Sequence, residues 1–197
     1  CRECLRRAQE FARRAIAADP AYAEGYVELA AAMGFDARII GPLRSRIANY
    51  PKQAKDAIDK ALELSPGDPW ALSAAGGWNI EVVRTGGTML GGIFYGASFE
   101  DGVALYRKAM AADPGNLTVA LNYALAVTSY DFAGKRLEIM AVLDSVARAE
   151  PRDAYAQAMK ERAAMLLDLL TRDRRAQYQA LARRYLGWRN RQRVVVL

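Results

Sequence analysis

Four stretches of the chain repeat one arrangement of apolar residues, and each stretch ends at a proline. Counted back from Pro20, Pro66, Pro114 and Pro151, the marked positions lie twelve, eight and five residues earlier. They hold Ala8, Ala12 and Ala15; Ala54, Ile58 and Ala61; Gly102, Tyr106 and Ala109; and, in a degenerate fourth unit, Ile139, Leu143 and Val146. Proline cannot continue a helix, and Asp or Asn beside it can cap the next one. The pattern therefore predicts an all-α chain of helices joined by short turns.

The helix that follows each turn has a small residue at one fixed place, which is Ala30, Gly76 or Ala124. Together with the small and large positions before each proline, these residues resemble the tetratricopeptide repeat (TPR) family. The resemblance covers nearly the whole chain and implies a right-handed α-solenoid of helical hairpins. It implies no particular function, because the shared residues are scaffold residues. A generic alanine-rich helical bundle is the alternative, but it gives no reason for fixed offsets from a proline.

The prolines are 46, 48 and 37 residues apart, whereas a TPR unit has about 34. We therefore expect two insertions, Phe35 to Pro51 and Arg84 to Phe99, which emerge as apolar loops on one face and contact each other. The contacting residues should be Ile39, Ile40, Leu43, Met89, Leu90, Ile93, Phe94 and Tyr95. The second insertion is rich in glycine but lacks the phosphate-loop motif, so a strand-like or broken-helix excursion is expected rather than a phosphate site.

Part of the second insertion carries two further resemblances. The stretch from Trp78 to Ser98 is similar to TPR proteins related to the regulator of microtubule dynamics family. The chain is also similar to periplasmic TPR components of tripartite substrate-transport systems. We expect a bacterial protein, and these two resemblances assign no chemistry to individual residues.

In TPR arrays the first helices line a concave groove, and this register gives a set of candidate ligand-binding residues. They are Val27, Phe35, Trp70, Ser73, Asn79, Ile80, Glu81, Arg84, Thr118, Leu121, Asn122 and Leu125. The Lys and Asn positions with which some TPR proteins grip a chaperone carboxylate hold Val27, Ser73 and Leu121 instead, among others. We therefore expect a peptide or an extended apolar ligand in the groove, with the insertions as a cover. The alternative is that the insertions mediate self-association.

The composition argues against catalysis. The chain has no histidine, which excludes Ser-His and Cys-His machinery and removes the commonest zinc ligand. No two carboxylates are placed across a substrate, so we expect no enzyme activity, no metal and no cofactor. Cys1 and Cys4, three residues apart, are expected to be two plain thiols rather than a redox site.

The hydrophobic fraction of 52% and the charged fraction of 25% are ordinary for a globular domain. No apolar run reaches the roughly 20 residues that span a bilayer. The compartment stays open between bacterial cytoplasm and periplasm, because Cys1 fits either a trimmed chain or a lipoprotein N-terminus. Since the chain starts on a second-helix pattern, we expect a first helix upstream.

The net charge of +6 is concentrated at the C-terminus, where residues 172–197 hold eight arginines and one aspartate. We divide the chain into a repeat domain, 1–171, and a basic capping helix and tail, 172–197. An apolar stripe of Tyr178, Leu181, Tyr185 and Trp188 should cover the helix at 154–170. The arginines could instead contact nucleic acid, which we do not expect, or an anionic membrane, for which we expect only weak, salt-sensitive attraction.

Overall fold

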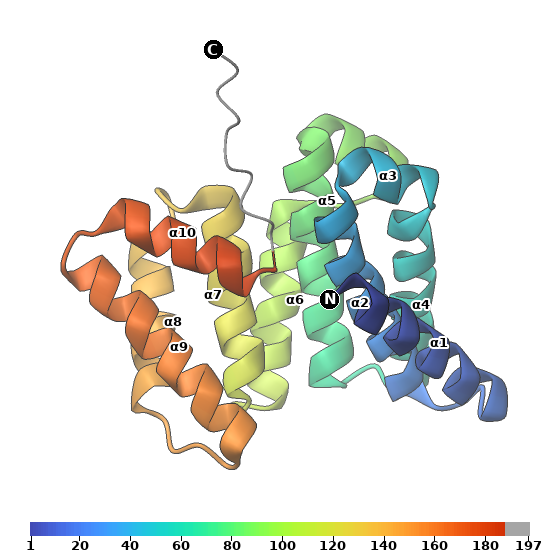
Figure 1. Ribbon diagram of the computed structural model, residues 1–197, viewed down its shortest axis with the longest axis horizontal. Helices are drawn as coiled ribbons and strands as arrows, with labels where there is room; N and C mark the ends of the chain where they lie inside the picture. Colours follow the sequence, from blue (N-terminus) through green and yellow to red (C-terminus); the bar gives the residue numbers. More distant parts are fainter. Residues whose placement is uncertain (188–197) are drawn as a thin grey trace.

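The computed structural model describes residues 1–187, apart from the side chain of Leu90, and this part of the chain is helical without strands (Figure 1). The predicted all-α fold is thereby confirmed. The helices are α1 (Arg2–Ala18), α2 (Ala23–Ile40), α3 (Pro42–Ile47), α4 (Tyr50–Leu64), α5 (Pro69–Tyr95), α6 (Phe99–Ala112), α7 (Leu117–Asp131), α8 (Arg136–Arg148), α9 (Ala154–Thr171) and α10 (Arg175–Tyr185).

The four prolines end helices as predicted. Helices α1, α4, α6 and α8 each stop two or three residues before their proline. The next helix then begins on a side-chain cap in three of the four turns. Asp68, Asn116 and Asp153 accept hydrogen bonds from the backbone N–H groups of Ala71, Val119 and Ala156. The turn chemistry visible in the sequence therefore sets most of the helix boundaries.

Consecutive helices pack side by side along the molecule. In Figure 1, α1 to α4 form one half, α8 to α10 form the other, and α5 to α7 lie between them. One continuous apolar core joins the halves. Its fully buried large side chains include Met33, Tyr123, Leu143 and Leu166.

Two glycines let α5 and α6 approach each other closely. A Cβ added to Gly102 would lie 2.6 Å from Ile80 Cγ1 and 3.0 Å from the carbonyl oxygen of Gly76. A Cβ on Gly76 would lie 2.9 Å from the carbonyl oxygen of Gly102. Both glycines occupy positions at which the sequence predicts a small residue, and Tyr106 packs against the same contact. The small positions thus serve close backbone packing.

Both insertions are helical, which corrects the expectation of loops. Helix α2 runs on to Ile40, Gly41 breaks it at φ 88°, and the short α3 follows. Helix α5 continues through the second insertion, with a break at Gly87 (φ 78°), and ends at Gly96. The broken-helix alternative is therefore the one observed. A segment that continues as helix after a glycine break satisfies its backbone N–H and C=O groups within the segment. A long loop could not satisfy them in this way.

Helix α10 packs against α7 and α9 at the C-terminal end of the described chain. Its buried residues are Tyr178 and Ala182, and Leu186 directly after it is buried too, whereas Leu181 and Tyr185 are half-buried. The apolar stripe is thus rotated from the predicted one, because α10 lies over α7 as well as over α9. The prediction of a basic tail also applies to residues that lie outside the described part of the chain, namely Trp188, Arg189, Arg191 and Arg193.

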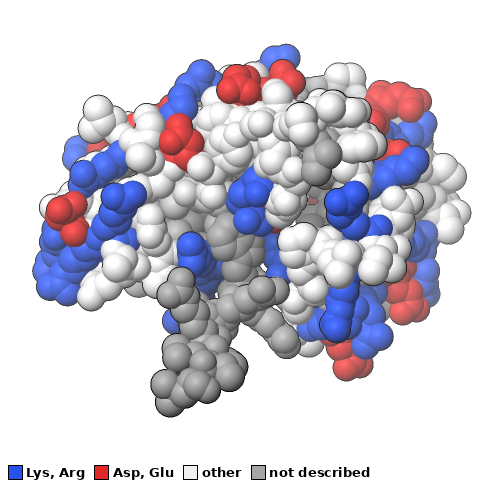
Figure 2. All heavy atoms as spheres, turned by 90° about the horizontal axis from the view of Figure 1, so that it is seen from above, with Lys and Arg blue, Asp and Glu red and all other residues white. Residues whose placement is uncertain are grey.

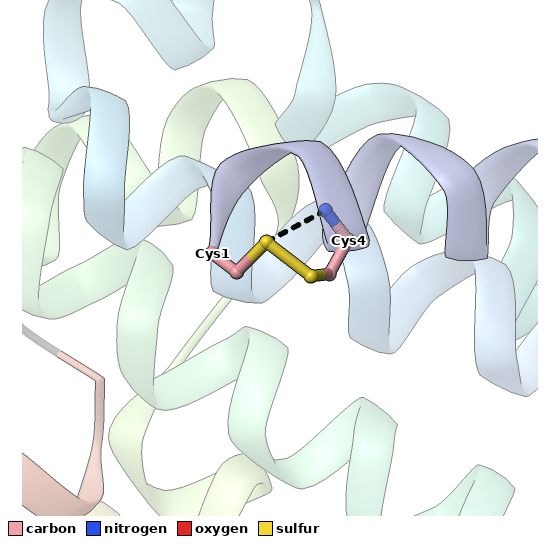
Figure 3. Close-up of a disulfide and its surroundings, with 2 residues drawn as sticks. All are labelled: Cys1 and Cys4. Atoms are coloured by element: carbon pink, nitrogen blue, oxygen red, sulfur yellow. Dashed lines mark hydrogen bonds between the residues drawn. A yellow bond between two sulfur atoms is a disulfide. The ribbon is translucent and has the colours of Figure 1, made fainter.

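The two cysteines form a disulfide, so the prediction of two free thiols is wrong (Figure 3). Their Cα atoms are 5.3 Å apart, and the backbone N–H of Cys4 donates to Cys1 Sγ over 3.2 Å. The spacing of three residues places both side chains on one face of the first turn of α1. The bond stays within that turn and joins no separate elements.

Glu138, in the first turn of α8, ties three helices together. It accepts hydrogen bonds from Tyr123 of α7 and, over 2.7 Å, from Arg107 of α6, and it pairs with Lys135 at 3.2 Å. Burial by itself would raise the pKa of Glu138, but the hydrogen bonds from these three partners outweigh it and lower the pKa to about 2. Burial and the hydrogen bond to Glu138 raise the pKa of Tyr123.

Glu138→Gln should therefore destabilise the protein at neutral pH by roughly 1–3 kcal/mol. A carboxylate with a lowered folded-state pKa stabilises the fold above its unfolded pKa of about 4.3, and this contribution is lost as the pH falls through about 2. The gap between wild type and variant in urea unfolding should thus shrink by more than about half between pH 6 and pH 3. Glu63→Gln is the matched control, because its exposed carboxylate pairs only with Lys60 in the described structure. A gap that stays constant with pH would contradict the assignment.

Candidate functional site

A cluster of charged side chains lies where α2 faces α5. Glu81 of α5 accepts two hydrogen bonds from Arg84, one turn further on, at 2.5 and 3.1 Å. Arg38 of α2 approaches the same carboxylate, with Nε 3.9 Å from Oε2. Glu81 and Arg84, both candidate groove residues, therefore form an ion pair, and Arg38 approaches it from the neighbouring helix.

Arg38 leaves one donor unused. Its Nε is buried and has no hydrogen-bond partner among the described residues, since 3.9 Å to Glu81 exceeds hydrogen-bond length. Another of its nitrogens donates to the carbonyl oxygen of Leu186 over 3.2 Å, and the guanidinium lies 5.4 Å from the ring centroid of Phe35. A buried donor without a partner costs free energy unless an acceptor reaches it.

The end of α10 closes one side of this cluster. Leu186 contacts Arg38, and a side-chain carbon placed on Gly187 would lie 3.5 Å from the ring of Phe35. Phe35 nevertheless remains 43% exposed, so an exposed apolar ring lies beside the largely buried side chain of Arg38, which is 17% exposed.

Tyr106 of α6 lies buried beneath the cluster. Burial raises the pKa of Tyr106 to about 12, although Arg38 and a hydrogen bond with Ser73 act in the opposite direction. The phenol is therefore neutral across the physiological range. It serves as a fixed hydrogen-bonding group and not as an acid or base near pH 7.

The structure divides the predicted groove residues into three groups. Val27, Ile80, Leu121 and Leu125 are in the apolar core, and Ser73, Asn79 and Thr118 are buried as well. Asn79 donates to the Ala75 carbonyl and accepts from Ser98 N–H, so it holds the turn between α5 and α6. Glu81, Arg84 and Asn122 are half-buried, and Phe35 and Trp70 are the exposed ones.

Phe35 and Trp70 do not share one site. Trp70 lies in the first turn of α5, eleven residues before Glu81, which is about 16 Å along a helix axis. The candidate site therefore consists of Phe35, Arg38, Glu81 and Arg84, with Ser73 and Tyr106 below them. Sequence reasoning missed Arg38 and Tyr106. Arg38 was assigned to the first insertion, and the signal that could have found it is its place one turn after Phe35.

The ends of the two insertions form a second exposed region. Leu43, Met89, Ile93 and Phe94 are at least 68% exposed, and Ile39, Ile40 and Tyr95 are half-buried. Residues of both insertions line one cavity of about 420 Å³, namely Arg46 and Asn49 of the first and Phe94 and Tyr95 of the second, together with Lys52 and Lys55. Ile39, Ile40 and Leu43, which were predicted to meet the second insertion, are not among its lining residues. The side chain of Leu90, also predicted to take part, lies outside the described residues.

Two classes of feature are absent from the described residues. No helix within residues 1–187 is long and apolar enough to cross a membrane. No group of three or more Cys, Asp or Glu side chains in that part of the chain is arranged to hold a metal ion.

Comparison with curated proteins and with solved structures gave no match. The family model described as regulator of microtubule dynamics protein 1-3 matches residues 1–171. This match contains the stretch from Trp78 to Ser98 that carries the same resemblance in the sequence, and it extends over both insertions and all helices up to α9. The chain therefore belongs to the regulator of microtubule dynamics protein 1-3 family.

Proposed function

We propose that the protein is a non-catalytic binding protein that holds a peptide or an extended apolar ligand at the Phe35–Arg38–Glu81 site. We further propose that its helices form a right-handed, TPR-like solenoid with this site on the inner face. The fixed offsets of small residues from each proline support the TPR assignment, as does the contact between Gly76 and Gly102.

One observation carries the binding proposal. The buried Nε of Arg38 lacks a partner and lies beside the exposed ring of Phe35. A peptide carbonyl or carboxylate can accept from the guanidinium of Arg38, whose side chain is 17% exposed, while an apolar side chain of the ligand packs on the ring. Sites of this kind combine an apolar surface with a few placed polar groups. Glu81 then fixes the orientation of the guanidinium and does not act on the ligand.

Peptides selected from a displayed random library by the wild-type protein should bind Arg38→Gln and Phe35→Ala at least about tenfold more weakly, since one hydrogen bond to a charged donor is worth roughly 1.5–3 kcal/mol. Fluorescence anisotropy measures the affinities. The matched controls are Arg14→Gln and Phe11→Ala, because Arg14 lies 5.8 Å from the exposed ring of Phe11 on α1. Equal losses in the controls, or no selected peptide, would contradict the proposal. Steady turnover of a substrate that is lost in Glu81→Gln would contradict the non-catalytic assignment.

A second candidate function is self-association through the insertions. The exposed apolar residues at their ends favour it. If it holds, sedimentation over a concentration range will show a stable dimer, and Phe94→Ser with Tyr95→Ser will abolish it. A monomer at all concentrations would rule it out.

A further inference from the structure

The insertion end of the molecule exposes an unusual density of large apolar side chains. Leu43 and Ile47 project from one face of α3 and are 73% and 78% exposed. Met89 and Ile93 share a face of the last part of α5, and with Phe94 they are 68–71% exposed. In Figure 1 both elements lie at the same end of the molecule. We call residues 42–47 and 88–95 the insertion end.

The two chain segments that form the insertion end carry only basic charged residues. From position 37 to position 55 the chain has five Lys or Arg and no acid, and from 82 to 99 it has Arg84 and no acid. Arg44 and Arg46 are exposed and make no ion pair with any described residue. The nearest acids in the sequence after α5, Glu100 and Asp101, belong to the start of α6. Figure 2 looks onto this end of the molecule and shows uncoloured surface with both basic and acidic side chains beside it.

A cavity at the edge of this apolar surface gathers hydrogen-bond donors. Arg46, Asn49, Lys52 and Lys55 line it on one side, and Phe94 and Tyr95 line it on the other, around a volume of about 420 Å³. Lys52 and Lys55 also pair with Asp56 and Asp59, whereas Arg46 is not engaged by the described residues. An anionic phosphate diester with part of its headgroup has the charge and size for this space.

We infer that the insertion end docks onto the surface of an anionic phospholipid bilayer. The exposed apolar side chains enter the region between headgroups and acyl chains; they are Leu43, Ile47, Met89, Ile93 and Phe94. The lysines and arginines remain at the level of the phosphates. Apolar side chains flanked by basic ones are the arrangement by which peripheral proteins bind such surfaces. The cavity holds one headgroup phosphate. This inference concerns a different surface from the Phe35–Arg38–Glu81 site and does not depend on a ligand there.

The positive charge of the insertion end favours an anionic bilayer over a second copy of the chain as its partner. In a two-fold dimer the same patch would face itself, so Arg44 and Arg46 of each copy would meet those of the other with no acid between residues 37 and 55 to compensate. Burying like charges without partners is costly. An anionic bilayer supplies the missing opposite charge and the apolar phase together.

Co-sedimentation with vesicles tests the inference. The wild-type chain should bind phosphatidylcholine vesicles that contain about one third phosphatidylglycerol and should bind pure phosphatidylcholine at least about tenfold more weakly. Binding should weaken as the salt concentration is raised. Met89→Ser with Phe94→Ser should reduce binding to the anionic vesicles at least about tenfold, and so should Arg44→Gln with Arg46→Gln.

Two matched controls locate the effect. Leu137→Ser removes an apolar side chain of α8 that is 83% exposed, and Arg183→Gln with Arg184→Gln removes two exposed charges from α10. Both should leave vesicle binding unchanged, and all variants should keep the wild-type melting temperature. Equal binding to neutral and anionic vesicles, or loss of binding in the α10 variant alone, would overturn the inference. So would a dimer in sedimentation that the Met89 and Phe94 substitutions abolish, without any vesicle binding.

Discussion

Replacing Gly102 with valine is expected to destabilise the protein by roughly 2–4 kcal/mol. The added Cβ would meet Ile80 Cγ1 at 2.6 Å and the backbone carbonyl of Gly76 at 3.0 Å. Ile80 can shift only by displacing its buried neighbours, and the carbonyl belongs to the backbone of α5. Helices α5 and α6, which lie between the two halves of the molecule, would have to separate.

Alanine at position 102 gives a sharper test, because its effect on stability should have the opposite sign to that of Gly→Ala at an open helix position. In an open helix position, Gly→Ala stabilises by about 0.5–1 kcal/mol. Gly34 of α2 is such a position, since a Cβ there would meet nothing within 4 Å. We expect Gly34→Ala to stabilise the protein and Gly102→Ala to destabilise it.

Urea unfolding followed by circular dichroism measures both changes. If Gly102→Ala were as stabilising as Gly34→Ala, the close packing of α5 on α6 would be refuted. The Gly76 position offers an independent repeat of the test, with 2.9 Å between a Cβ and the Gly102 carbonyl oxygen.

The helix boundaries could be predicted because their causes are local. Proline and its capping neighbours end one helix and start the next regardless of what packs around them, as Asp68 and Asn116 show. The small positions were also visible, because only a residue without a long side chain permits a close helix contact. Gly76 and Gly102 carry that signal in the sequence.

The burial of the candidate site residues could not be predicted in the same way. A repeat register places Ile80, Leu121 and Leu125 on the first helices, but those helices contact neighbours on several sides, and the core contains all three. Arg38 was missed because its helix was expected to end at Phe35. The extra turn of α2 brings Arg38 to Glu81, and no local rule fixes how far a helix runs into an insertion.

The insertions show a further limit of the sequence. Glycine-rich composition indicated a break in the backbone, and Gly87 does break α5, but composition does not state whether helix resumes after the break. Likewise, a spacing of three residues permitted both two thiols and the observed bond between Cys1 and Cys4. In both cases the sequence was compatible with two outcomes.

The expected result for Tyr178→Ala is a loss of about 3–5 kcal/mol of stability, as for other large aromatic truncations in a core. The Tyr178 side chain is fully buried, its ring centroid lies 5.3 Å from that of Phe132, and its hydroxyl lies 2.5 Å from Thr128 Oγ1. Burial raises the pKa of Tyr178 to about 12, so the hydroxyl stays protonated and hydrogen-bonded at physiological pH. Removing this ring empties the space between α10 and α7.

Two further variants serve as comparisons. One distinguishes the contribution of packing from that of the hydrogen bond, and the other measures the effect of removing an exposed tyrosine. Tyr178→Phe keeps the ring and should cost only about 1 kcal/mol, because Thr128 retains its bond to the Ala124 carbonyl. Tyr155→Ala on α9, where the side chain is 61% exposed, should change the stability by less than about 0.5 kcal/mol. Thermal and urea unfolding of the three variants give the ranking. If the free energy of unfolding of Tyr178→Ala equals that of Tyr155→Ala, α10 is not part of the cooperative core. If Tyr178→Ala unfolds in a single transition with a free energy of unfolding several kcal/mol below the wild-type value, α10 is the cap that closes the helical array.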